Sequence, residues 1–199
     1  HSRVSGTRLR ECFTKPCNMS VISDYQKKLK KAGLYHGEID GDFGPLTLLA
    51  AQEFHCGPNK VPRWMLIAGQ ELGVSEIYGG RDNPRIVMYH GSTSLGGSPD
   101  EVAWCSSFVN WCMETAGRTG TNSAAARSWD SWGTRMRAPL FGAVHTVPRT
   151  GGSGRHVFFN AGYTDTHVFG LGGNQSDKVN IVPYRRAILT ATRWPFTQV

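Results

Sequence analysis

The chain has 199 residues, a net charge of +7 and a hydrophobic content of 39%. This composition predicts a folded globular protein, and no apolar run approaches the roughly 18 residues that a membrane span needs. The N-terminus also lacks the apolar region of a secretory signal, so we expect a soluble protein without an export signal in this chain. The charge favours an anionic partner, namely nucleic acid, a membrane surface or a cell-wall polymer.

The distribution of the basic residues narrows this expectation to one region. Eight of the 22 lysines and arginines precede Ala32, so the N-terminal part is the expected docking surface. The five cysteines cannot all pair within one chain. Cys12, Cys17 and Cys56 could supply a disulfide, but only in an oxidising compartment, and the sequence leaves this open.

The first regular pattern along the chain is helical. Apolar residues recur at helical spacing from Ser20 until Gly33, with lysines between them. The segment "DGDFG" at 40–44 supplies a turn, Pro45 fits the first position of a second helix, and Gly57 ends it. These elements predict a compact helical module.

The remainder of the chain reads as helices followed by strands. Helical spacing appears after Arg63, in "RIVMYH" and in the segment Ala103–Gly117, which carries two cysteines. Four runs rich in β-branched and aromatic residues then predict an antiparallel sheet: "GAVHTVP", "RHVFFNAG", "THVFGLGG" and "VNIVPY". We therefore predict an α+β fold with a module at residues 1–59 and a second domain at residues 60–199.

The two cysteines of the segment differ in their expected surroundings. Cys105 falls in the first turn of the predicted helix, where free N–H groups and the helix dipole stabilise a thiolate. Cys112 lies two turns later in the apolar stripe, where a cysteine usually acts as a small apolar residue. Cys105 is therefore the candidate nucleophile, although from position alone a packing role is the commoner one, because buried cysteines are common and reactive ones are rare.

A cysteine nucleophile needs a base, and histidines in the strand region are the candidates. His145, His156 and His167 are eleven residues apart each time. His156 opens a strand and shares a face with Asn160, although each of the three could be a hydrogen-bonded sheet histidine. Three histidines could also bind zinc for an amidase, but no HExxH or CxxC motif accompanies them.

The helical module resembles the small three-helix type of peptidoglycan-binding domain, which has a characteristic spacing of Gln, Gly, aromatic and Asp residues. The resemblance implies that Tyr35, Asp40, Phe43 and Thr47 contact the polymer. The family's usual Gln after the final Phe is His55 here. The matching residues are Gln26, Leu29, Gly33, Tyr35, Gly37, Ile39, Asp40, Gly41, Phe43, Gly44, Pro45, Thr47, Ala50 and Phe54.

The second domain resembles the NlpC-type and CHAP-type cysteine peptidases and amidases, in particular the subgroup common in bacteriophage lysins. The resemblance rests on "RWMLIAGQELGVSE", "NPRIVMYH", "WCSSFVNWCMETAG", "ARSWDSWG" and "LGGNQSDKVNI". It implies a papain-like fold in which Cys105 is the nucleophile, His156 the base and Asn174 the residue that orients the imidazole. His167 and Gln175 are the alternatives for this third role, and Trp104 is an expected substrate contact.

Together the two resemblances predict an endolysin-like peptidoglycan hydrolase that needs no metal or cofactor. We expect a monomer that is made in the cytoplasm and acts on the cell wall, without nucleic-acid binding or membrane insertion. A non-catalytic wall-binding or adhesion protein is the alternative, because Arg155 separates Gly154 from His156 where the family usually has Gly directly before the His. The sequence does not distinguish an amidase from an endopeptidase, nor a phage enzyme from a bacterial toxin or autolysin.

Overall fold

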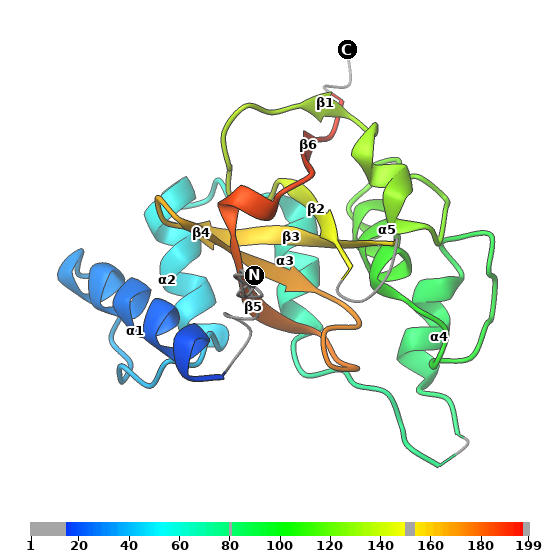
Figure 1. Cartoon of the computed structure of the whole chain (residues 1–199), viewed down its shortest axis with the longest axis horizontal. Coiled ribbons are helices and arrows are strands. Elements are labelled where there is room, and N and C mark those ends of the chain that lie inside the picture. The colour runs from blue at the N-terminus through cyan, green and yellow to red at the C-terminus, as the bar shows by residue number, and fades with distance from the viewer. Residues whose placement is uncertain (1–14, 80, 150–153, 197–199) are drawn as a thin grey trace, which may run out of the picture.

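A computed structural model describes residues 15–79, 81–149 and 154–196, and it combines helices with an antiparallel sheet (Figure 1). The prediction of an α+β fold is confirmed at this level. Most helices precede the strands. The helices are α1 (Lys15–Lys31), α2 (Pro45–Cys56), α3 (Arg63–Gln70), α4 (Pro84–His90) and α5 (Cys105–Thr115), and two short 3-10 helices span Ala126–Asp130 and Arg186–Ile188.

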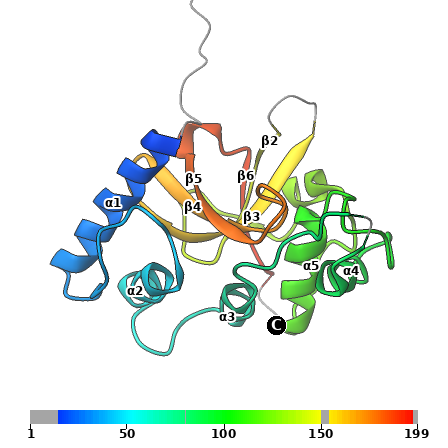
Figure 2. The ribbon, with the colours of Figure 1, turned by 90° about the horizontal axis from the view of Figure 1, so that it is seen from below.

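The sheet has six antiparallel strands in the order β1-β6-β2-β3-β4-β5. Figure 2 shows α2, α3 and α5 side by side on one face of the sheet, and α5 and α2 both contact the long strand β3. The strands are β1 (Thr134–Arg135), β2 (Val144–Pro148), β3 (Arg155–Tyr163), β4 (His167–Gly172), β5 (Asn180–Arg185) and β6 (Ala191–Trp194).

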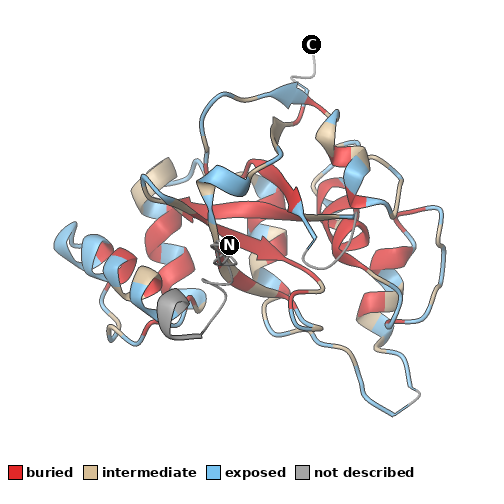
Figure 3. Cartoon of the chain, in the orientation of Figure 1, coloured by how far each residue is buried: buried red, intermediate tan, exposed pale blue. Residues whose placement is uncertain are grey.

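The buried apolar residues form a layer between the helices and the sheet, and β3 and β4 are mostly buried (Figure 3). The largest cluster of buried residues runs from Ile22 in α1 to Ile181 in β5. Tyr25 and Phe43, from the predicted module, lie 4.5 and 4.9 Å from the ring of Phe169 in β4. The core is therefore continuous across the predicted domain boundary at residues 59 and 60.

A buried amide explains the "DGDFG" turn of the predicted module. The side chain of Gln26 is fully buried, and its Nε2 donates to Asp40 Oδ1 at 2.7 Å and to the Asp42 carbonyl at 2.9 Å. Its Oε1 accepts from the N–H of Gly41, whose φ of 74° favours glycine. The hydrogen bond from Gln26 also lowers the pKa of Asp40. The loop thus folds around one side chain of α1.

Most of the predicted wall contacts in this module are interior residues. Tyr35 and Phe43 are 4% exposed and Thr47 is 1% exposed, whereas Asp40 is exposed. In this structure the three buried side chains stabilise the module and cannot contact a polymer at its surface. None of the helices in the described part of the chain is long and apolar enough to cross a membrane.

Candidate active site

Cys105 is the first residue of α5, which packs against β3. Burial raises the pKa of its thiol. Several groups act in the opposite direction: the backbone N–H of Val157 on β3, the charge of Arg149, and the N–H groups of Ser106 and of Cys105 itself. The start of the helix therefore supplies two of these groups, the N–H groups of Cys105 and Ser106, at the position where the sequence predicts the first turn.

Cys112 lies deeper in the same helix and is fully buried. Burial, followed by the negative charge of Glu71, raises the pKa of its thiol well above the usual value. It does not line the pocket that Cys105 lines. Cys112 therefore has the surroundings of a packing residue.

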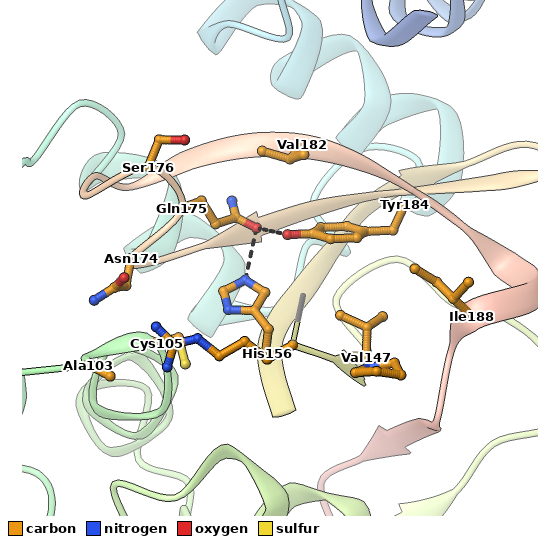
Figure 4. A pocket seen from close by; sticks show the side chains of 12 residues that line it. Ala103, Cys105, Val147, His156, Asn174, Gln175, Ser176, Val182, Tyr184 and Ile188 are labelled. Carbon is orange, nitrogen blue, oxygen red and sulfur yellow. Dashed lines mark hydrogen bonds between the residues drawn. The ribbon is translucent and has the colours of Figure 1, made fainter. Parts of the chain in front are cut away.

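Cys105 and His156 line one pocket of about 310 Å³, which lies between the start of α5 and the sheet (Figure 4). The pocket has polar residues and an apolar part. In Figure 4 the side chains of Asn174 and Ser176 lie on one side of His156, and Val147 and Ile188 lie on the other. The pocket therefore has a polar side and an apolar side.

His156 is positioned by the β2–β3 ladder, where it lies opposite Val147. Burial lowers the pKa of its imidazole to about 4, and the nearby charge of Arg149 acts in the same direction. A hydrogen bond between its Nε2 and Oε1 of Gln175, 3.1 Å long, partly offsets this effect. The imidazole is therefore neutral near pH 7, as a general base must be.

The neighbours of Gln175 determine which nitrogen of His156 carries the proton. The Nε2 of Gln175 donates to the backbone carbonyl of Asn180 at 2.8 Å and to that of Gly170 at 3.2 Å. These bonds identify the other atom of the amide as the oxygen Oε1, which accepts from the hydroxyl of Tyr184 at 2.8 Å. Because an amide oxygen has no proton to donate, Oε1 also accepts in its bond with His156. The proton of the neutral imidazole therefore lies on Nε2, and Nδ1 has a free lone pair. In Figure 4 the ring lies between Gln175 and Cys105.

Asn174, the residue expected to orient the imidazole, contacts Trp104 instead. With its amide oxygen turned toward the indole, Asn174 accepts from the backbone N–H of Trp104 at 3.2 Å and from its Nε1–H at 3.1 Å. The partner of His156 is thus Gln175, one of the two alternatives to Asn174 for this role. The physical reason is the positive φ of Asn174, 56°, which turns the chain between the two residues.

Trp104 is fully buried, so it cannot be the substrate contact that the sequence suggests. Its indole N–H also donates to Glu76 at 2.7 Å. Gly173 lies directly against the indole, where a Cβ atom would come within 2.4 Å of Cζ3. Trp104 therefore holds the loop that carries Asn174 and Gln175 against the start of α5.

A second group of polar residues, which sequence reasoning missed, holds the opposite side of α5. The hydroxyl of Ser106 donates to the Ser123 carbonyl at 2.6 Å and accepts from Nε1 of Trp129 at 2.9 Å. Oδ1 of Asn110 accepts from the N–H groups of Thr121 and Asn122. The segment "CSSFVN" contains a signal for this group, because Ser106 and Asn110 are one helical turn apart and therefore lie on the same side of the helix.

The other predicted histidines lie apart from this site. Nδ1 of His145 pairs with the Thr192 hydroxyl at 3.0 Å, and His167 pairs with its neighbour Thr166. Among the described residues, possible metal-ligand atoms lie within 4.8 Å of one another in Asp82, Asp100 and Glu101. His145, His156 and His167 form no such group. This arrangement does not support the zinc alternative.

Arg155, the departure that favours a non-catalytic alternative, leaves the site open. It lies opposite Pro148 in the ladder, and its Nε contacts Oδ2 of Asp130 at 3.1 Å. It is not among the residues that line the pocket. Of the cysteines considered for a disulfide, Cys56 is a free thiol, and Cys12 and the side chain of Cys17 lie outside the described residues.

Comparison with known proteins adds no assignment to this geometry. No family model, no curated protein and no solved structure matches the chain.

Proposed function

We propose that the chain is a peptidoglycan hydrolase with a papain-like active site formed by Cys105, His156 and Gln175. One observation carries the proposal. The hydrogen bonds of Gln175 keep the proton of His156 on Nε2, so that Nδ1 is free as a base in the pocket that Cys105 lines. This division of roles is the one that a cysteine nucleophile with a histidine base requires.

The pKa directions define the resting state of the pair. Burial raises the pKa of Cys105 and lowers that of His156, so thiol and imidazole are both neutral before substrate binds. The proton passes from Sγ to Nδ1 as the sulfur attacks the amide carbonyl and the S–C bond forms. The N–H of Cys105 at the helix start can donate to the oxyanion.

The second half of the reaction returns the proton. The imidazolium gives it to the amide nitrogen, the C–N bond breaks, and the amine leaves a thioester on Cys105. Water then attacks the thioester with His156 as base, which releases a carboxylic acid and restores the thiol. Gln175 accepts a hydrogen bond from His156 throughout and stabilises the charged ring.

The substrate assignment rests on the N-terminal module and on charge. Helix α1 has exposed lysines in its last turns, including Lys28, Lys30 and Lys31. Together with the resemblance to wall-binding modules, these charges favour an anionic wall polymer as partner. A module attached to the enzyme raises its effective concentration at this polymer.

The experiment is cleavage of purified peptidoglycan, measured by loss of turbidity and by mass spectrometry of the released fragments. We expect Cys105→Ala to abolish release and Cys112→Ala to retain it, with both variants binding the polymer. The fragment masses also identify the bond that is cut. Release by Cys105→Ala would refute the assignment, and loss of activity with a chelator would favour zinc. Binding by the wild type without any release would favour an adhesion protein.

A further inference from the structure

The charge inside the pocket that Cys105 lines has one sign. Among the residues that line the pocket, Arg149 carries a fixed positive charge. No Asp or Glu of the described chain lines the pocket. Val147, Val182 and Ile188 give the pocket an apolar wall. A ligand that matches this surface carries a negative charge close to a small apolar group.

Arg149 is held by a backbone hydrogen bond, and its side chain is exposed. Its N–H donates to the Gly154 carbonyl at 3.0 Å, next to the Pro148–Arg155 pair that ends the β2–β3 ladder. The side chain is exposed, and no hydrogen bond or ion pair to the guanidinium occurs among the described residues. By contrast, the neighbouring Arg155 is neutralised by Asp130. A guanidinium without a partner is suited to bind a planar carboxylate with two hydrogen bonds.

The electrostatic effects of Arg149 locate its charge relative to the reacting atoms. Arg149 lines the same pocket as Cys105 and His156, and its charge lowers the pKa of both groups. An anion bound by Arg149 would therefore lie beside the amide bond under attack, and not at a distant end of the substrate.

We propose that Arg149 is a specificity-determining residue that binds a free carboxylate of the stem peptide next to the scissile amide. The inference rests on the proposed function and narrows its substrate to anionic stem peptides. A carboxamide at the same position has the same shape as the carboxylate but no charge.

The test compares two soluble stem-peptide fragments that differ only in this group, carboxylate or carboxamide. We expect the wild type to prefer the carboxylate by about 10- to 100-fold in kcat/KM, mainly through KM, because a charge-assisted contact is replaced by a weaker one. Arg149→Gln should lower cleavage of the carboxylate form to the level of the carboxamide form, and Arg149→Lys should restore part of the preference.

The matched control is Arg185→Gln, which removes the same charge from an exposed position of β5 that does not line the pocket. It should leave the preference unchanged. A second readout needs no substrate: alkylation of Cys105 by iodoacetamide should require a higher pH in Arg149→Gln, because the thiolate loses a nearby cation.

Two outcomes separate the inference from the function on which it rests. Equal cleavage of the two peptides by the wild type, or an equal loss on both in Arg149→Gln, would overturn the role of Arg149 and leave the hydrolase intact. Cleavage of neither peptide by the wild type would overturn the proposed function itself.

Discussion

Replacing Gln175 with methionine tests the central contact of the site. Methionine has a similar volume, but its thioether is only a weak acceptor in place of the amide oxygen that accepts from His156 Nε2 at 3.1 Å and from Tyr184 at 2.8 Å. A hydrogen bond to a charged ring contributes about 1.5–3 kcal/mol, so the lost stabilisation of the imidazolium should lower kcat by about 10- to 150-fold. KM should change little, because the imidazolium forms only during the reaction.

The assay measures kcat and KM on a soluble wall fragment from pH 4 to 9, with thermal unfolding of each variant. Because the hydrogen bond that His156 donates to Gln175 raises the pKa of the imidazole, its removal should also move the acid limb of kcat/KM to lower pH. The matched control is Asn174→Gly, which keeps the positive φ available and removes the contacts with Trp104 but leaves the bond between His156 and Gln175 in place. If this control loses kcat and Gln175→Met does not, the assignment of Gln175 is refuted and Asn174 is the orienting residue.

Three further predictions concern the stability of the fold. Gly173→Ala should lower the free energy of unfolding by about 1–3 kcal/mol, because the added Cβ would lie 2.4 Å from an indole carbon of Trp104. The control in thermal unfolding is Gly97→Ala, where the nearest atom to the added Cβ lies 3.9 Å away. Burial lowers the pKa of both His55 and His145 to about 4, so their contribution to stability is complete above about pH 6.5 and is lost as the pH falls toward 4. Urea unfolding between pH 4 and 8 should show this fall in the free energy of unfolding, and a flat profile would contradict it. Cys112→Ser should destabilise the fold by about 1–3 kcal/mol more than Cys112→Ala, since it buries a hydroxyl among apolar groups, and equal midpoints in urea would argue against this.

The sequence patterns that depend on burial predicted the fold well. The helix that begins at Cys105 and the strands β2 to β5 follow from apolar spacing, because each of these elements has a buried side. Strands β1 and β6 were missed. They have two and four residues, and none of them is fully buried, so they lack a periodic signal. Their position in the sheet depends on pairing between distant segments, such as Val144 with Arg193.

The third residue of the site shows a different limit. The motif "GGNQ" correctly located the loop that meets His156, but it could not distinguish Asn174 from Gln175. The choice depends on a positive φ at one residue, and Asn is among the residues that adopt it most readily. A backbone turn of this kind reverses which side chain faces the pocket without changing the spacing of the letters.

The sequence pattern of the N-terminal module does not separate residues that the fold requires from residues that bind a ligand. Its spacing identified a folded unit, yet several of its characteristic positions are interior, as the hydrogen bonds of Gln26 show. A pattern of residues that a fold requires looks the same in sequence as a pattern that a ligand requires. Exposure distinguishes them, and exposure depends on tertiary packing.

The aromatic contacts between α1, α2 and the sheet have a consequence for any attempt to divide this protein. The ring of His55 stacks on Tyr163 at 4.4 Å, its Nε2 pairs with the hydroxyl of Tyr25 at 2.8 Å, and Tyr25 in turn packs on Phe169. A fragment that starts after residue 59 would expose these rings of β3 and β4 to water. The parts before and after residue 59 should therefore unfold in a single cooperative transition. A hydrolase truncated at this point should aggregate because of its exposed rings, in addition to losing its wall-binding module.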